Sequence, residues 1–201
     1  MENLGFLFNT WIKFFFLFTP FFVLSVFMGY TRECPVEERN RIVTNSMLTV
    51  AGLCIGLLFF GKVVFALFGI TLDAFRVGAG ALLFLSAIPA MQGQSVSNVS
   101  EAHEDVTVVP LAMPVVVGPA TIGALLVLGG GMHGVAQKLL GCVAVVLAVF
   151  CLWIILRMGT VIEKALGQRG LRIMTKITGL VLSALSAQMI LTGIKHFFEV
   201  E

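Results

Sequence analysis

The chain has 201 residues, of which 58% are hydrophobic and only 12% are charged, and its mean hydropathy is +1.02. Soluble domains carry roughly 25% charged residues, so this composition excludes a soluble globular fold and predicts an all-α integral membrane protein. The net charge of +2 is too small to indicate nucleic acid as a partner. Because the polar stretches are too short for an independent fold, we expect residues 1–201 to form a single membrane domain.

Six apolar stretches are long enough to cross a bilayer as helices. In chain order they cover roughly residues 4–30, 46–68, 72–91, 109–128, 138–156 and 176–198. The predicted connections are a charged loop, a short turn, an acidic cytoplasmic connector, a glycine-rich turn and a basic loop. They cover residues 32–45, 69–73, 94–108, 129–134 and 157–176. The chain lacks the basic start and cleavage site of a signal peptide, so we expect the first span to be retained.

Prolines interrupt the first and fourth predicted spans. Pro20 lies near the middle of the first span, and Pro110, Pro114 and Pro119 lie in the fourth. Each proline removes an amide donor, and an unpaired carbonyl in hydrocarbon costs several kcal/mol unless protein, a cavity or a ligand satisfies it. The fourth span is therefore a candidate site, although a kinked helix whose gaps are filled by Ser or Thr hydroxyls would also explain the pattern. Lys13, in the first span, is able to reach outward to the membrane surface.

The basic residues predict an orientation in the membrane. With six spans, eight of them fall on one side, namely Arg32, Arg39, Arg41, Arg157, Lys164, Arg169, Arg172 and Lys176. Five fall on the other side, namely Lys13, Lys62, Arg76, Lys138 and Lys195. By the positive-inside rule the first side is cytoplasmic, so both termini are expected to be periplasmic.

Several residues recur about one hundred positions further along the chain. The matched pairs include Leu82 and Leu182, Leu85 and Leu185, Ser86 and Ser186, and Ala87 and Ala187. Pro20 likewise precedes Pro119 by ninety-nine positions. Residues 1–93 and 109–201 each hold three spans and would be oppositely oriented, which predicts the 3+3 inverted repeat of many secondary transporters, with helices 1 and 4 interrupted. Chance identity among small and apolar residues is the alternative.

A broken helix offers chemistry for a zwitterion. The amides that start its second half hold an anion, and the carbonyls that end its first half hold a cation or an ammonium. The predicted substrate-binding residues are Thr19 and Pro20 in the first half of the chain and Gly118, Pro119, Ala120 and Thr121 in the second. No carboxylate falls at the middle of a span, so a charged relay is unsupported and solutes of strong net charge are disfavoured.

Other constellations point away from a cofactor, a metal or an enzyme. Glu101, His103, Glu104 and Asp105 lie in the polar connector without the spacing of a metalloprotease motif, and a solvated linker explains them. The four cysteines show no paired spacing. Intramembrane hydrolysis needs a nucleophile with a base or paired acids, and none is found at membrane depth. Gln188, in the sixth span, is either helix glue or cavity lining.

Four segments carry a resemblance to a known family. They are VPLAMPVVVGPATI at residues 109–122, VEERNRI at 36–42, FGI at 68–70 and FRVGAG at 75–80. Together they resemble the MarC (UPF0056) family of six-span bacterial inner-membrane proteins over essentially the whole chain. Members resemble the SnatA neutral amino acid transporters and fall among the LysE-like exporters, which implies a small neutral amino acid as substrate. Thr19 stands where the family usually has Asn, and Ala120 where it often has Gly.

The sequence therefore favours a secondary transporter that moves a small neutral solute, an amino acid, by alternating access. Its expected partners are that solute and the lipid bilayer, and a homo-oligomer is left open. Two alternatives remain, an exporter of another small metabolite or drug and a membrane scaffold that transports nothing. An intramembrane enzyme is a distant third.

Overall fold

The computed structural model describes residues 2–31, 34–92, 116–132 and 134–199, in which all regular structure is helical. The helices are α1 (Glu2–Leu17), α2 (Pro20–Tyr30), α3 (Val36–Phe68), α4 (Leu72–Gln92), α5 (Pro119–Gly131), α6 (Val135–Arg157) and α7 (Gly159–Glu199). Five helical stretches in these ranges are long and apolar enough to cross a membrane, and the shorter helix Ala120–Gly131 is also apolar. The predicted all-α membrane architecture is confirmed at this level. The predicted connector and the start of the fourth span lie outside the described residues.

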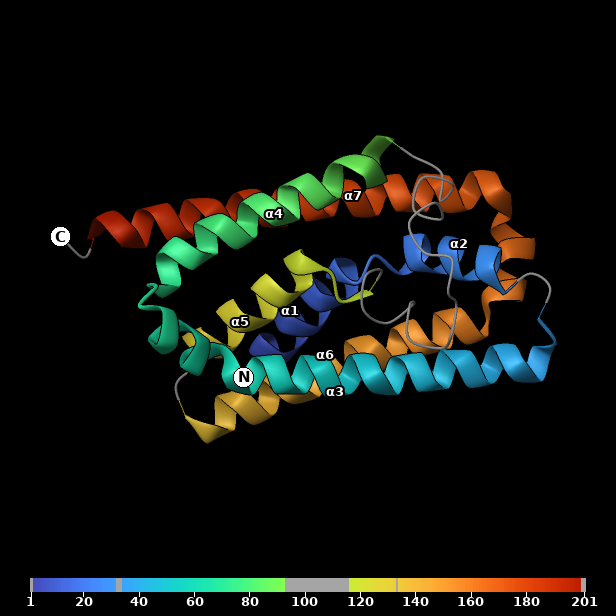
Figure 1. Ribbon diagram of the computed structural model, residues 1–201. Coiled ribbons are helices and arrows are strands. Elements are labelled where there is room, and N and C mark those ends of the chain that lie inside the picture. Colours follow the sequence, from blue (N-terminus) through green and yellow to red (C-terminus); the bar gives the residue numbers. More distant parts are fainter. Residues whose placement is uncertain (1, 32–33, 93–115, 133, 200–201) are drawn as a thin grey trace.

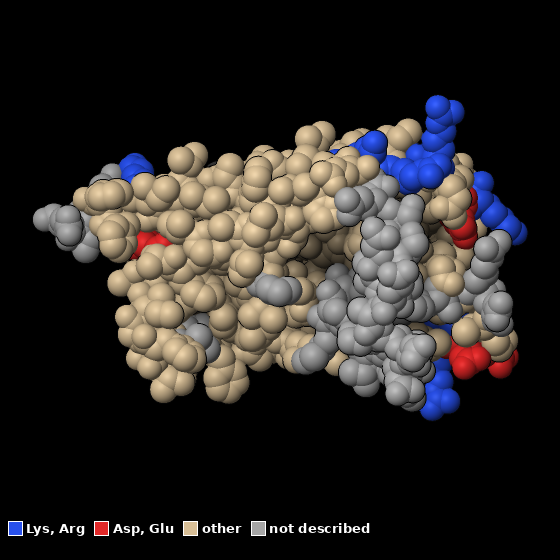
Figure 2. All heavy atoms as spheres, turned by 45° about the horizontal axis from the view of Figure 1, so that its top comes forward, with Lys and Arg blue, Asp and Glu red and all other residues tan. Residues whose placement is uncertain are grey.

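The helices run along one common direction, which gives the bundle two ends (Figure 1). The end that we call the terminal end carries the α3–α4 turn, the α5–α6 turn and the last residues of α7. The opposite end, here the basic end, carries the last residue of α2, the start of α3 and the α6–α7 junction. Figure 2 shows most of the visible Lys and Arg side chains gathered at the basic end, with a broad uncharged surface beside them. That surface is suited to lipid contact.

The loop predicted between the first two spans is wrong over most of its length, because α3 begins at Val36. Glu37 and Glu38 lie in its first turn, where acidic side chains favour the positive end of the helix dipole. Glu and Arg are also strong helix formers, so this charged stretch extends the apolar span rather than ending it. Arg39 then donates to the Thr160 hydroxyl of α7 at 3.2 Å, which ties the extension to its neighbour.

The basic loop predicted after the fifth span is also wrong. Helical structure resumes at Gly159 and continues to Glu199, interrupted only at Gly167, whose backbone has φ 63° and ψ 171°. This left-handed φ is one that glycine adopts without strain. The chain therefore crosses the basic end as a short helix and turns at Gly167 into the long part of α7 (Figure 1).

The glycine-rich turn predicted at residues 129–134 is shorter than expected, because α5 continues to Gly131. At Gly129 the backbone of α5 lies so close to the carbonyl oxygen of Leu58 in α3 that an added Cβ would collide with it. Glycine is needed here for close approach of two helices, as in many membrane bundles. The glycines therefore serve helix packing as well as the turn.

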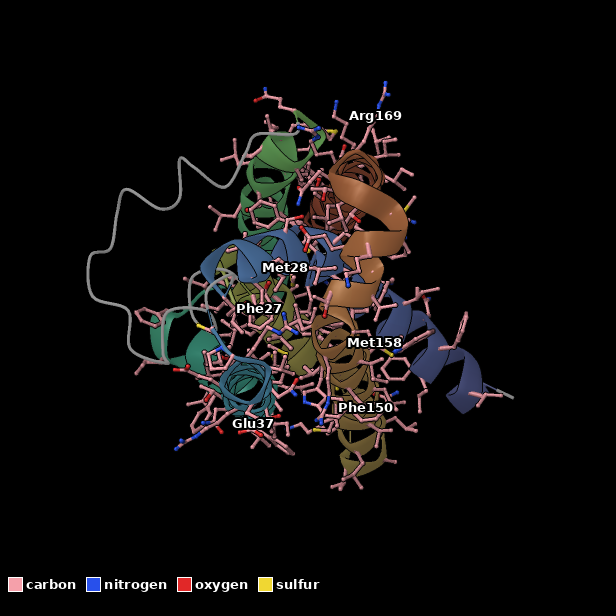
Figure 3. All side chains as sticks on the ribbon, turned by 90° about the vertical axis from the view of Figure 1, so that its right-hand side faces the viewer. Phe27, Met28, Glu37, Phe150, Met158 and Arg169 are labelled. Carbon is pink, nitrogen blue, oxygen red and sulfur yellow. The ribbon has the colours of Figure 1, made fainter. Side chains whose placement is uncertain are left out.

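The core runs through the middle of the bundle, from α2 toward the basic end to Met132 in the α5–α6 turn. Among its fully buried side chains are Phe18, Leu24 and Phe27 from the first predicted span. Figure 3, viewed from the basic end, shows Phe27 and Met28 of α2 in the interior of the bundle, with α3 on one side and α7 on the other. An added Cβ at Gly159 would meet Leu24 at 2.9 Å and the Met28 sulfur at 3.0 Å. Helix α2 therefore fills the centre of the basic end.

Candidate functional site

The first break lies where the sequence predicts an interruption. Helix α1 ends at Leu17 and α2 begins at Pro20. Pro20 has no amide hydrogen, and the Phe16 carbonyl instead accepts a bond from the Thr19 amide at 2.9 Å. Thr19 adopts φ 45° and ψ 59°, a left-handed conformation that is rare for a β-branched residue. The first bond of α2 then runs from the Val23 amide to the Thr19 carbonyl at 3.0 Å.

The helix after the second break, α5, begins with a proline and a first hydrogen bond in the same register as those of α2. Gly118 caps α5 with extended backbone, and Pro119 occupies the first turn. The first bond of the helix runs from the Ile122 amide to the Gly118 carbonyl at 3.0 Å. This bond lies ninety-nine positions after its counterpart in α2, which is also the spacing of the two prolines. The two helix starts therefore share a proline and a hydrogen-bond register, although Thr19 is left-handed and Gly118 is extended.

The side chains of Ala120 and Thr121 are buried and leave almost no surface for a ligand to contact. They are 6% and 4% exposed. The Thr121 hydroxyl donates to the Val116 carbonyl at 3.2 Å, so it satisfies the chain just before the break. In the present conformation these two side chains therefore support the break. Their backbone amides precede the first intrahelical bond of α5 and have no acceptor within that helix.

The two half-helices point away from each other. From starting points in the middle of the bundle, α2 runs to the basic end and α5 to the terminal end (Figure 1). The N-terminus of a helix carries a partial positive charge of about half an elementary charge. Both positive ends therefore lie in the middle of the bundle, where the sequence predicts a solute.

A cavity of about 220 Å³ lies between α1, α4, α5 and α7. Its deep wall is apolar and includes Leu17, Leu83 and Leu185, of which Leu17 ends α1 at the first break. Arg76 and Thr192 line it nearer the terminal end. Arg76 and Leu83 are seven residues apart on α4, so the cavity reaches about 10 Å along the helix.

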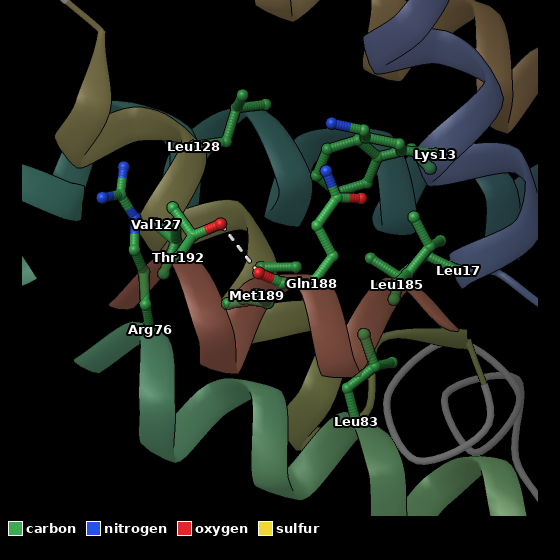
Figure 4. A pocket seen from close by; sticks show the side chains of 12 residues that line it. Lys13, Leu17, Arg76, Leu83, Val127, Leu128, Leu185, Gln188, Met189 and Thr192 are labelled. Carbon is green, nitrogen blue, oxygen red and sulfur yellow. Dashed lines mark hydrogen bonds between the residues drawn. The ribbon is translucent and has the colours of Figure 1, made fainter. Parts of the chain in front are cut away.

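Four polar side chains line this otherwise apolar space, namely Lys13, Arg76, Gln188 and Thr192. Figure 4 shows Gln188 of α7 and Lys13 of α1 pointing toward one another. Arg76 donates to Asp73 at 2.6 Å, and the same nitrogen lies 3.1 Å from His196 Nδ1, so it links α4 to the end of α7. The Thr192 hydroxyl donates to the Gln188 carbonyl at 2.7 Å.

Of the six predicted site residues, Thr19, Pro20, Gly118, Ala120 and Thr121 do not line this cavity, and the side chain of Pro119 lies outside the described part of the chain. The cavity adjoins the first break at Leu17 and reaches α5 at Ala124, five residues after Pro119, and side chains at both breaks belong to one buried core. Gln188 lines the cavity, as one of its two interpretations from the sequence holds. Lys13, expected to reach outward, is exposed and also lines the cavity. A cation in the middle of an apolar run is by itself a signal of function, and it could have identified Lys13.

Thr19 gives a prediction about stability. A left-handed backbone costs an ordinary residue about 1–2 kcal/mol, while Asn adopts it more readily. We expect Thr19→Asn to stabilise the protein by about 1 kcal/mol and to raise the apparent Tm in detergent by about 2–4 °C. The control is Thr49→Asn, at an exposed helical threonine of α3, which should change Tm little. A lower Tm for Thr19→Asn would contradict the strain at this break.

Comparison with known proteins identifies the class and then the family. The apolar helices and the interrupted first span define an all-helical integral membrane protein. The chain belongs to the MarC family of integral membrane proteins, whose model matches residues 4–198. A UPF0056 membrane protein of Aquifex aeolicus is 30% identical, over 99% of this chain and 97% of its own length. UPF0056 membrane protein YhcE of Escherichia coli is 33% identical, over 95% of this chain and 93% of its own length. No solved structure matches the chain.

Proposed function

We propose that the protein is a secondary transporter that moves small neutral amino acids across the bacterial inner membrane by alternating access. The observation that carries this proposal is the largely apolar cavity beside the first break, into which α1 and α7 direct the polar side chains of Lys13 and Gln188 (Figure 4). Midplane sites between broken helices are the usual arrangement in secondary transporters. Lipid-facing packing alone would not require such a cavity.

The two ends of the bundle support alternating access because they differ. The cavity extends toward the terminal end, where Arg76 and Thr192 line it. Toward the basic end the chain is closed by α2, whose residues Val23, Leu24 and Phe27 are 0% exposed. This conformation corresponds to access from one side, and movement of α2 would open the other. With the basic end cytoplasmic, as the positive-inside rule predicts, the cavity faces the periplasm.

The packing of α4 against α7 supports the proposed inverted repeat. An added Cβ at Gly80 of α4 would meet the backbone of Ser186 and Ile190 of α7, and one at Gly179 of α7 would meet Ala87 and Met91 of α4. Each residue of the first contact has its counterpart in the second contact ninety-nine positions away, with the helices exchanged. Such reciprocal contacts are what a two-fold relation between two halves produces. The residue pairs that recur in the sequence, such as Leu82 and Leu182, are one hundred positions apart and so are offset by one position from these contacts.

The size of the cavity supports a small substrate over a drug. Pockets for drug-sized ligands are roughly 300–1,000 Å³, whereas this cavity has a volume of about 220 Å³. Export of another small metabolite remains the second candidate, because the volume alone does not choose among small solutes.

Counterflow in proteoliposomes tests the proposal. Vesicles loaded with unlabelled alanine, glycine or serine should accumulate the labelled amino acid from outside when they contain the protein. Protein-free vesicles and vesicles loaded with sucrose are the controls. If none of the three amino acids is exchanged or taken up under any imposed ion gradient, the proposed function is wrong.

A further inference from the structure

The cavity carries one positive charge that no described residue balances. Lys13 has no ion-pair partner among the described residues, whereas Arg76 is paired with Asp73 at 2.6 Å. No Asp or Glu of the described chain lines the cavity. Lys13 is exposed, so the cavity is open beside its ammonium, and an ionisable residue within an apolar span usually marks a functional site. A ligand with a negative group would balance the charge.

The helix breaks place further positive potential near this lysine. Lys13 lies four residues before the end of α1, or about 6 Å along the helix from the first break. The N-terminal ends of α2 and α5 both lie in the middle of the bundle, and their partial positive charges favour an anionic group. The ammonium and the starts of α2 and α5 favour a negative group in the cavity. The carbonyls that end α1, four residues after Lys13, favour a positive group beside it.

Gln188 supplies a second donor opposite Lys13. Its carboxamide both donates and accepts, and it points across the cavity toward the lysine (Figure 4). The backbone carbonyl of Gln188 accepts a hydrogen bond from the hydroxyl of Thr192, which lies one turn later in α7. An ammonium and an amide from opposite walls are suited to the two oxygens of one carboxylate. The side-chain oxygen of Gln188 remains to accept from a second polar group of the ligand.

We propose that this cavity binds a small solute through its carboxylate, and that Lys13 and Gln188 recognise that group. The inference rests on the proposed transport function and specifies its substrate class. A carboxylate is obligatory, the rest of the molecule is small, and strong net positive charge is excluded. Amino acids and hydroxy acids share this chemistry, so the choice between them is left to the experiment.

Three probes of nearly equal size separate the chemical groups. Alanine has a carboxylate and an ammonium, lactate replaces the ammonium with a hydroxyl, and alaninol replaces the carboxylate with an alcohol. The measurement is the ligand-induced rise in apparent Tm of the purified protein, which reports the dissociation constant by mass action. We expect alanine to stabilise the protein and alaninol not to do so at equal concentration. Equal stabilisation by alaninol would overturn the carboxylate site.

Variants of the lysine complete the test. Lys13→Gln should weaken alanine binding about tenfold, the loss expected for one charge-assisted hydrogen bond, and Lys13→Arg should recover most of it. The matched control is Lys138→Gln, which removes a cation in the first turn of α6, 5.5 Å from the ring of Phe59 and outside the cavity. Wild-type affinity in Lys13→Gln would overturn the inference.

The outcomes also separate this inference from the proposed function. Alanine counterflow that is unchanged in Lys13→Gln would leave transport standing and remove the carboxylate site. Stabilisation by lactate alone, lost in Lys13→Gln, would keep the site and remove amino acids as the substrate. A wild-type protein that binds none of the three probes would overturn both.

Discussion

Replacing Pro20 with alanine is expected to lower amino acid flux at least tenfold while leaving the protein folded in the membrane. A proline inside a continuous helix costs about 3 kcal/mol, and alanine removes that cost. A shift of this size changes the balance between a broken and a continuous first span about a hundredfold. The restored amide could then bond the Phe16 carbonyl, which now accepts from Thr19 at 2.9 Å. A continuous helix would remove the half-helix start in the middle of the bundle.

Counterflow of alanine in proteoliposomes measures the effect. The matched control is Pro89→Ala, because Pro89 is exposed and lies within α4 without breaking it. Flux in the control should stay close to that of the wild type. The equivalent variant at the second break, Pro119→Ala, should behave like Pro20→Ala. Full transport in both break variants would remove the interruptions from the mechanism.

Replacing Gly129 with alanine is expected to destabilise the protein by about 2 kcal/mol. Alanine is the better helix former by about 1 kcal/mol, so in open space this change would stabilise α5. The new Cβ would instead collide with the carbonyl oxygen of Leu58, a backbone atom that cannot move without displacing α3. Overpacking of this kind typically costs about 1–3 kcal/mol, which outweighs the gain in propensity.

A glycine of the neighbouring helix α3 provides a control for which the expected change in apparent Tm has the opposite sign or is absent. Gly56 of α3 has nothing within 4 Å of an added Cβ, so Gly56→Ala should leave the apparent Tm unchanged or raise it. Gly129→Ala should lower it by several degrees in the same detergent. Stabilisation by both substitutions would mean that α3 and α5 do not pack through Gly129.

The breaks could be predicted from the sequence because they depend on a local property. Pro20 and Pro119 lack an amide donor wherever they stand, and both helices begin at these residues. The membrane character follows as directly from composition. The sequence predicts loops where α3 and α7 begin, because these stretches are charged. Glu and Arg, however, favour helix as strongly as many apolar residues do.

The cavity could be predicted only in part because it depends on how four helices pack. Gln188 had two interpretations in the sequence, and only the neighbouring α1 decides between them. Lys13 fits either the membrane surface or a cavity, since its long side chain can reach in more than one direction. Helices α2 and α5 begin at two of the six predicted site residues, Pro20 and Pro119, but the polar side chains that line the space between the helices come from elsewhere in the sequence.

Protection of a cysteine at position 127 tests the central claim most directly, because Val127 lines the cavity without a proposed contact to the carboxylate. In a variant whose four native cysteines are replaced, Val127→Cys should react with a membrane-impermeant thiol reagent added from the terminal end. Saturating alanine should slow this labelling, while Leu139→Cys, at an exposed position on α6, should react equally with and without alanine. Slower labelling at position 127 alone is the result that a solute-binding cavity predicts. Labelling at position 127 that alanine leaves unchanged would contradict it.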